Sequence, residues 1–279
     1  MTGSLARALW LAWRSPTGRI AAITFLLMAL VALIGPHLLA DPTLIPDAVA
    51  GAAAPSASHP LGTDQLSRDV LSRVVSGARV SLAVAALAVA LSLTVGAAVG
   101  LIAGYAGGLT DAVLMRLVDG ALAVPRLFVL LLVLVWDRIP LAALILVIGV
   151  TGWFGTSRLV RGEVLRLRRA EFVQAAEALG ATPGRIILRH LLPNVAGPLI
   201  VTATLGLGDV ILLEAGLSFL GLGVQPPTPS WGGMILDARP VLLTAPWTSL
   251  FPGLAILITV LAANLLGEAL QSAFDPRTA

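Results

Sequence analysis

The side chains that could do chemistry are few in this sequence, and they form no catalytic pattern. The sequence contains no cysteine, and all 18 of its basic residues are arginine. The phosphate-binding pattern GxxxxGK[ST] needs a lysine, so the chain cannot supply this type of ATP site. The patterns HExxH and GxSxG and a Ser-His-Asp arrangement are also missing. The three histidines, His37, His59 and His190, are scattered along the chain, so no metal site follows from them. We therefore predict no catalytic residue, no metal and no cofactor in this chain.

Charged side chains do occur inside apolar segments, where they are costly and usually face protein or water rather than lipid. Asp209 and Glu214 lie in one such segment and could form a polar site along a transport pathway. They could instead be a helix-packing or interfacial pair, because Glu214 lies near the end of its segment. Arg116, Asp119 and Arg126 lie in another segment. The i,i+3 spacing of Arg116 and Asp119 predicts an ion pair with a structural role.

A polar stretch at residues 171–198 separates two long apolar segments and has the pattern of two short helices. Small and apolar residues of the first helix recur at helical spacing: Phe172, Ala175, Ala176 and Leu179. Gly180 fits the left-handed position that ends a helix. Thr182 and Pro183 predict the N-cap and first position of the second helix. We expect Pro193 to end this helix and Asn194 to cap the apolar segment that follows.

Composition indicates that a lipid bilayer is the main solvent of the chain. The sequence is 57% hydrophobic and 12% charged, whereas soluble domains average about 25% charged residues. A net charge of +3 over 279 residues is too slight to indicate a nucleic-acid partner. A helix needs about 20 apolar residues to cross the hydrocarbon. Six segments meet this length approximately: residues 20–39, 80–105, 112–136, 139–154, 195–220 and 247–269.

The distribution of arginine predicts the orientation of these six spans. Arginines are concentrated before the first span and between the fourth and fifth: Arg7, Arg14, Arg19, Arg158, Arg161, Arg166, Arg168, Arg169, Arg185 and Arg189. By the positive-inside rule both regions are cytoplasmic. The N-terminal segment 1–19 and the tail 273–279 are then inside the cell, and residues 40–79 are outside. A cleaved signal peptide is the alternative for the first span, but the segment is long and lacks a good cleavage site.

The two outer stretches are predicted to contain short helices. Thr63 or Asp64 can cap a helix, and apolar residues after them fall on one face: Leu66, Val70, Leu71, Val74 and Val75. We expect an amphipathic helix here that lies at the outer interface and leads into the second span. In the second outer stretch, a proline-rich turn precedes a possible helix at Trp231–Ala238.

The stretch after residue 171 resembles the EAA loop of ABC-importer permeases. That pattern is Glu-Ala-Ala, three residues, Gly, nine residues, and Ile-x-Leu-Pro. The chain has Gln174-Ala175-Ala176, then Gly180, then Leu192-Pro193 at the matching spacing. It departs from the pattern at two positions, where Gln174 replaces the first glutamate and His190 replaces the isoleucine. Glu177, one turn after Gln174, could supply the missing charge.

Four longer segments of the sequence narrow the resemblance to one type of permease subunit. The strings HPLGTDQLSRDVLSRVVSGARVSL, LMRLVDGALAVP, EAGLSFLGLGVQPPTPSWGGM and PGLAILITVLAANLLGEALQSAFDPR are similar to segments of the C-type permease subunits of dipeptide, oligopeptide and nickel importers. The resemblance covers nearly everything after residue 55. It implies a type I ABC importer permease fold of six transmembrane helices, with a core at 80–272 and a cytoplasmic coupling loop at 171–194. The residues that it assigns to coupling are Gln174, Ala175, Ala176, Glu177, Gly180, Ala181, Arg185, Leu192 and Pro193.

The same resemblance implies a set of partners and a location. These are a second homologous permease in a heterodimer, two ATP-binding subunits that bind ATP and Mg, an extracytoplasmic solute-binding protein and a peptide substrate. The location is the bacterial inner membrane. Import of nickel or another small solute by the same architecture remains open. An ion-coupled secondary transporter is a different class, and the sequence shows no inverted repeat or paired broken helices that would favour it.

Overall fold

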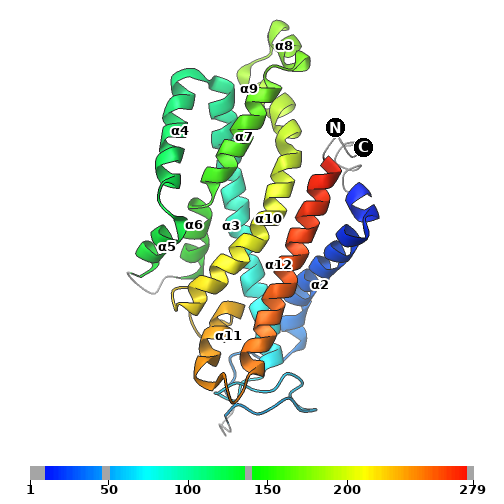
Figure 1. Cartoon of the computed structure of the whole chain (residues 1–279), viewed down its shortest axis with the longest axis vertical. Coiled ribbons are helices and arrows are strands. Elements are labelled where there is room, and N and C mark those ends of the chain that lie inside the picture. Colours follow the sequence, from blue (N-terminus) through cyan, green and yellow to red (C-terminus); the bar gives the residue numbers. More distant parts are fainter. Residues whose placement is uncertain (1–9, 46–50, 136–139, 275–279) are drawn as a thin grey trace.

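The computed structural model describes residues 10–45, 51–135 and 140–274 (Figure 1). Within these ranges the chain is helical, and its only β pairing is an isolated bridge between Thr63 and Asp69. The helices are α2 (Pro16–Leu38), α3 (Val70–Ala106), α4 (Gly108–Leu122), α5 (Arg126–Leu134), α6 (Leu141–Val150), α7 (Trp153–Leu167), α8 (Glu171–Ala178), α9 (Pro183–Ile186), the π-helix η1 (Ile187–Leu191), α10 (Leu192–Phe219), α11 (Trp231–Ala238), the 3-10 helix η2 (Arg239–Val241) and α12 (Trp247–Phe274).

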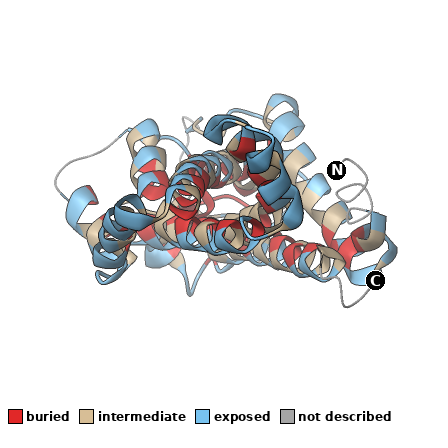
Figure 2. Cartoon of the chain, turned by 90° about the horizontal axis from the view of Figure 1, so that it is seen from above, coloured by how far each residue is buried: buried red, intermediate tan, exposed pale blue. Residues whose placement is uncertain are grey.

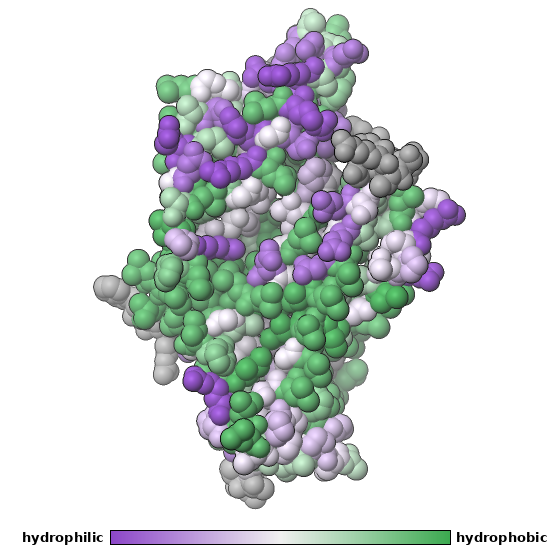
Figure 3. Space-filling model, in the orientation of Figure 1, coloured by the Kyte–Doolittle hydropathy of each residue, from purple (hydrophilic) through white to green (hydrophobic). Residues whose placement is uncertain are grey.

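The all-α membrane architecture is confirmed. Within the described residues, five helical stretches are long and apolar enough to cross a membrane: α2, α3, α6 with α7, α9 with α10, and α12. The pair α4 and α5 would make a sixth span, but the two helices are bent by 75°. Seen from above, buried residues lie on the inward sides of the helices and exposed residues on the outward sides (Figure 2). In side view, apolar residues form a broad band below the α8 end (Figure 3).

The third span differs from its expected form of one helix over 112–136. It breaks at residues 123–125, between α4 and α5. Pro125 has no backbone N–H, and it disfavours helical geometry at Val124, so the helix ends before it. Residue 136 of this span and residue 139 of the fourth lie outside the described residues. So do parts of the expected terminal segments 1–19 and 273–279.

The expected amphipathic helix before the second span is wrong as a separate element. Residues 63–69 are not helical, and α3 begins at Val70 with Asp69 as its N-cap. The Ser72 amide donates to Asp69 Oδ2 over 2.8 Å. Asp64 does not cap a helix, because its carboxylate accepts bonds from the guanidinium groups of Arg68 and Arg73. Helix α3 therefore starts ten residues before the expected span at 80–105 and is a single uninterrupted helix.

Pro193 does not end a helix, which corrects a second expectation. Residues Pro183–Phe219 form one continuous span in which η1 is a π turn. The Leu192 amide reaches the Ile187 carbonyl, five residues back. Pro193 follows directly after this π turn, at the start of α10, and the changed hydrogen-bond register lets the helix continue through it. Asn194 does not cap α10 either: its side-chain amide donates to the His190 carbonyl over 2.6 Å.

Helix α4 is held to α7 by two ion pairs. The Arg161 guanidinium donates to both carboxylate oxygens of Asp111, with an Nη2–Oδ2 distance of 2.6 Å. Asp119 pairs with Arg158. The expected pair of Arg116 with Asp119 is therefore wrong within the described residues, because a partner on the neighbouring helix takes the carboxylate.

Among the described residues, α3 and α7 form the most extensive helix pairing, and three glycines of α3 lie along it. Gly96, Gly100 and Gly104 recur every four residues on one face of α3. A Cβ atom added at Gly100 would lie 2.6 Å from the Ser157 carbonyl oxygen and 2.7 Å from Val160 Cβ. Small residues at this spacing let helix backbones approach closely in membranes.

This contact predicts that Gly100→Ala destabilises the chain, although alanine favours helix. Overpacking at a tight contact costs about 1–3 kcal/mol, which exceeds the gain of about 1 kcal/mol in helix propensity. Gly155→Ala in α7 is the matched control, because a Cβ there meets nothing within 4 Å. Thermal unfolding in detergent measures both. Equal unfolding midpoints for the two variants would contradict the close contact.

Candidate functional site

Helix α8 and the turn after it form a protrusion beyond the ends of the long helices (Figure 1). Hydrophilic residues gather at this end of the molecule (Figure 3). The start of α2 and the end of α12 also point toward it, whereas α11 lies at the opposite end. The protrusion is anchored by Val173, which is fully buried. The residues of its anchoring cluster are Ala97, Leu101, Val160, Val164, Leu167, Val173, Ile186, Leu191 and Val195.

The angle between α8 and α9 is set by the turn at Gly180, as the sequence predicts. Gly180 has φ +78°, a left-handed conformation that favours glycine. Its amide donates to the Glu177 carbonyl over 2.9 Å, and the Ala181 amide donates to the Ala176 carbonyl over 3.0 Å. This is the Schellman arrangement, which satisfies the last carbonyls of a helix. A Cβ at Gly180 meets nothing within 4 Å, so the constraint is backbone conformation rather than space.

Large apolar side chains are exposed on the protrusion and beside it. Leu179 is 88% exposed, Leu188 64% and Phe172 44%. Exposed apolar groups among polar residues are typical of surfaces that bind another protein. The predicted coupling residues surround it. Exposed among them are Gln174, Ala175, Glu177, Gly180, Arg185 and Pro193, and half-buried are Ala176, Ala181 and Leu192.

Gln174 and Glu177 make different contacts, which bears on the departure from the family pattern. The Gln174 side-chain amide donates to the Arg169 carbonyl over 3.3 Å. A glutamate has no amide N–H and could not make this bond while ionised. Glu177 instead accepts from the Tyr105 hydroxyl over 3.4 Å. This contact ties the protrusion to the end of α3.

Two residues of this region were missed by sequence reasoning. Tyr105 and Arg168 lie together beside Glu177, with the Arg168 guanidinium 5.5 Å from the centre of the Tyr105 ring. Tyr105 lies in an apolar segment and Arg168 in a basic run, so neither stands out in the sequence. Their role comes from the folded position of α8 next to the end of α3.

The two acidic residues predicted for a pathway are in different surroundings. Glu214 is fully buried, and its carboxyl oxygens accept from Ser218 Oγ over 2.7 Å and from Ser81 Oγ over 3.0 Å. Asp209, on the same helix, is exposed. The structure therefore does not bring them together: Glu214 joins α10 to α3, and Asp209 faces away from the packed core. Within the described ranges, no three His, Asp or Glu side chains come close enough to hold a metal.

Comparison with known proteins identifies the family. Residues 96–279 match the family model of the binding-protein-dependent transport system inner membrane component. A dipeptide transport system permease protein of Alkalihalophilus pseudofirmus is 43% identical over 186 residues, which are 67% of this chain and 61% of that protein. An oligopeptide transport system permease protein of Bacillus subtilis is 41% identical over 187 residues, with the same coverage. A putative peptide permease protein of Brucella ovis is 44% identical over 189 residues, covering 67% of this chain and 63% of that protein.

The chain thus spans less than two thirds of the length of these curated relatives. The family match extends from the middle of α3 through α12 and includes the whole protrusion. Several apolar helices of spanning length fall within the same region. The chain is therefore a multi-pass membrane protein that belongs to the family of binding-protein-dependent transport system inner membrane components.

Proposed function

We propose that the chain is a permease subunit of an ATP-driven importer of peptides in the bacterial inner membrane. The observation that carries this proposal is the protrusion with exposed apolar side chains at one end of a bundle of membrane helices. Such a surface suits a protein partner on the water side of the membrane. The names of the relatives, which are dipeptide and oligopeptide permeases, support the peptide cargo.

The proposal includes partners that supply what this chain lacks. The sequence has no lysine and no phosphate-binding pattern, so two ATP-binding subunits would bind ATP and Mg and dock on the protrusion. A second homologous permease would complete the pathway as a heterodimer, and an extracytoplasmic solute-binding protein would deliver the peptide. The family's printed description, binding-protein-dependent transport, supports this last partner.

The proposed mechanism is alternating access, with the protrusion as lever. Helix α3 has 37 residues and is about 55 Å long at 1.5 Å per residue. One end of this helix contacts Glu177 of the protrusion through Tyr105. The other end carries Arg73, which binds Asp237 of α11. A displacement of α8 would therefore reach the opposite end of the molecule through one continuous helix.

ATP dependence tests the proposed function as a whole. Vesicles containing the assembled complex and its binding protein should accumulate labelled dipeptide or oligopeptide only when ATP is supplied. Uptake of nickel instead of peptide would select the alternative cargo. Uptake that follows an ion gradient without ATP would select a secondary transporter and overturn the proposal.

Leu179→Asp should detach the ATP-binding subunits without preventing membrane insertion. A charge at the centre of an apolar contact removes a principal binding residue, and we expect about tenfold less ATP-binding subunit to co-purify with the permease. Leu243→Asp is the matched control, because Leu243 is 97% exposed and follows α11 and η2 in the chain, and α11 lies at the opposite end. Normal association in Leu179→Asp would contradict docking at this face.

The orientation of the chain is also a proposal, with the α8 end in the cytoplasm. The arginines near this end support it through the positive-inside rule. Because the chain has no cysteine, single cysteines report position without background. In the permease expressed without the ATP-binding subunits, which would cover this face, Leu179→Cys should react with a membrane-impermeant thiol reagent only after the membrane is opened, and Leu243→Cys should react in intact cells. The reverse pattern would invert the proposed topology.

We propose Asp209, rather than Glu214, as the pathway residue, since Asp209 is exposed and Glu214 is buried. An ionisable group at membrane depth is retained where it faces water or a partner. Asp209→Asn should lower peptide uptake severalfold while the amount of assembled complex stays unchanged. Glu163→Gln, which removes a surface pair with Arg166, is the control and should transport normally. Unchanged uptake in Asp209→Asn would remove this residue from the pathway.

A further inference from the structure

Helix α11 covers the end of the bundle opposite α8 (Figure 1). Its apolar side chains Trp231, Met234 and Ala238 are buried. Gly232 lies directly on α10: a Cβ at this position would be 2.5 Å from Ala215 Cα. The Trp231 indole N–H donates to the Val74 carbonyl of α3 over 2.9 Å. A short helix is thus inserted among the ends of α3, α10 and α12 and closes the space between them.

A chain of hydroxyl groups holds the first turn of α11. Ser230, the N-cap, accepts from the Gly233 amide over 3.2 Å and donates to Ser218 Oγ over 3.3 Å. Ser81 accepts from the Trp231 amide over 3.3 Å. Ser218 and Ser81 both bond to the buried carboxyl of Glu214. The N-terminus of α11 is therefore linked through serines to one carboxyl group that α10 provides.

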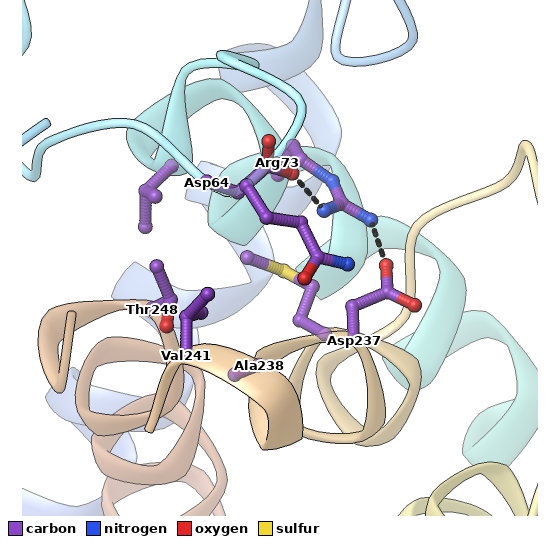
Figure 4. Close-up of a pocket in the computed structure, with 9 residues that line it drawn as sticks. Asp64, Arg73, Asp237, Ala238, Val241 and Thr248 are labelled. Atoms are coloured by element: carbon purple, nitrogen blue, oxygen red, sulfur yellow. Dashed lines mark hydrogen bonds and ion pairs between the residues drawn. The ribbon is translucent and has the colours of Figure 1, made fainter. Parts of the chain in front are cut away.

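An ion-pair cluster holds the last turn of α11. Figure 4 shows Arg73 between two carboxylates, with Asp64 on one side and Asp237 on the other. Arg73 Nη2 lies 2.9 Å from Asp237 Oδ2, and Arg68 Nη2 lies 3.4 Å from the same oxygen. Of these four residues, only Asp237 belongs to α11. The cluster thus joins the end of α11 to α3 and to the segment before it.

The side chain that α11 contributes to the ion-pair cluster is more exposed than its arginine partners, and α11 could separate from the bundle without leaving a buried charge unpaired. The Asp237 side chain is 31% exposed, whereas those of Arg68 and Arg73 are 9% and 5% exposed. If Asp237 departs, Asp64 still pairs with both arginines, so no buried charge loses its last partner. If Ser230 departs, Glu214 keeps Ser81 and Ser218, and Ser230 keeps the Gly233 amide. Detachment of α11 therefore strands no charged group.

The connection between α10 and α11 begins at a glycine turn and borders free space. Gly221 has φ +82°, and its amide donates to the Ser218 carbonyl over 2.9 Å, so the chain changes direction here at the end of α10. A cavity of about 450 Å³ lies between this connection and α11. Its polar lining residues include Arg73, Ser218, Gln225, Ser230 and Asp237. Residues of both contacts therefore face the same cavity.

We propose that α11 is a movable cover of the transport passage, and that Ser230 and Asp237 are the positioning residues that hold it closed. The serine contact and the ion-pair cluster break together when the passage opens at this end, and they reform when it closes. This inference rests on the proposed transport function and adds to it the element that moves. It also gives Glu214 a role: it is the fixed group to which the cover binds.

A reversible crosslink tests whether the cover must move. In Ser218→Cys/Ser230→Cys, the thiols replace hydroxyls that are 3.3 Å apart, close enough for a disulfide after a small adjustment. In the assembled complex, oxidation should lower peptide uptake at least about tenfold, because a disulfide fixes the N-cap of α11 to α10. A reducing agent should restore uptake. Equal uptake by the oxidised and reduced forms, with the disulfide verified by mass spectrometry, would overturn the proposal.

A second measurement leaves both contacts intact and does not depend on the crosslinked variant being active. Met234→Cys places a thiol on the buried face of α11. Its reaction with a membrane-impermeant maleimide should be slow at rest and at least about tenfold faster during ATP turnover, since opening exposes this face. Thr259→Cys, a fully buried position further along α12, is the control and should stay slow. If Met234→Cys reacts equally slowly at rest and during ATP turnover, in a complex that transports peptide, the moving cover is refuted.

The two outcomes separate the cover from the transport function. Wild-type complex that takes up no peptide with ATP would refute the proposed function itself. Wild-type complex that transports peptide, together with an unreactive Met234→Cys, would leave the function standing and remove only the cover.

Discussion

The close packing of α3 against α7 is the contact on which the rest of the structure depends. In hydrocarbon there is little hydrophobic gain from bringing helices together, so association relies on close van der Waals contact and on interhelical polar bonds. Gly96, Gly100 and Gly104 provide that contact over two turns of α3. Because α3 also packs against α2, α6, α10 and α12, its position fixes theirs. The protrusion is anchored on the same pair of helices through Leu101 and Val164.

The polar contacts lie mainly at the two ends of this helical framework. At one end, Tyr105 and Glu177 join α3 to α8. At the other, Arg73 joins α3 to α11 through Asp237. Between them, the long outward faces are apolar and suited to lipid, and charged groups are few. In the proposed transport cycle, α8 receives the force of the ATP-binding subunits, α3 carries it, and α11 responds.

Local patterns predicted the parts of the fold that local chemistry determines. Gly180 takes the left-handed turn that its position in the sequence indicates, and the short helix Trp231–Ala238 forms after Ser230. The length of the apolar segments located the membrane spans, since a helix is the simplest way to satisfy the hydrogen bonds of backbone groups in hydrocarbon. The residues of the protrusion were found because their spacing is a local property.

The errors arose where a distant partner decides the outcome. Asp64 has the sequence context of a helix cap, but Arg73 and Arg68 take its carboxylate. Asp119 is spaced to pair with Arg116, but Arg158 of α7 reaches it. Glu214 was grouped with Asp209, yet Ser81 of α3 encloses it. In each case the competing partner lies on another helix or on a turn whose geometry no sequence pattern shows. Pro193 is a different case, because a local π turn accommodates it.

The central claim is that the apolar face of α8 is the site where an ATP-binding subunit docks. The most direct measurement is photocrosslinking from an unnatural benzophenone side chain at position 179 in the assembled complex, followed by identification of the crosslinked protein. The account predicts a product that contains the ATP-binding subunit, and none from the same side chain at position 243. Crosslinks from position 179 only to lipid or to a second permease, in a complex that hydrolyses ATP and transports peptide, would contradict it.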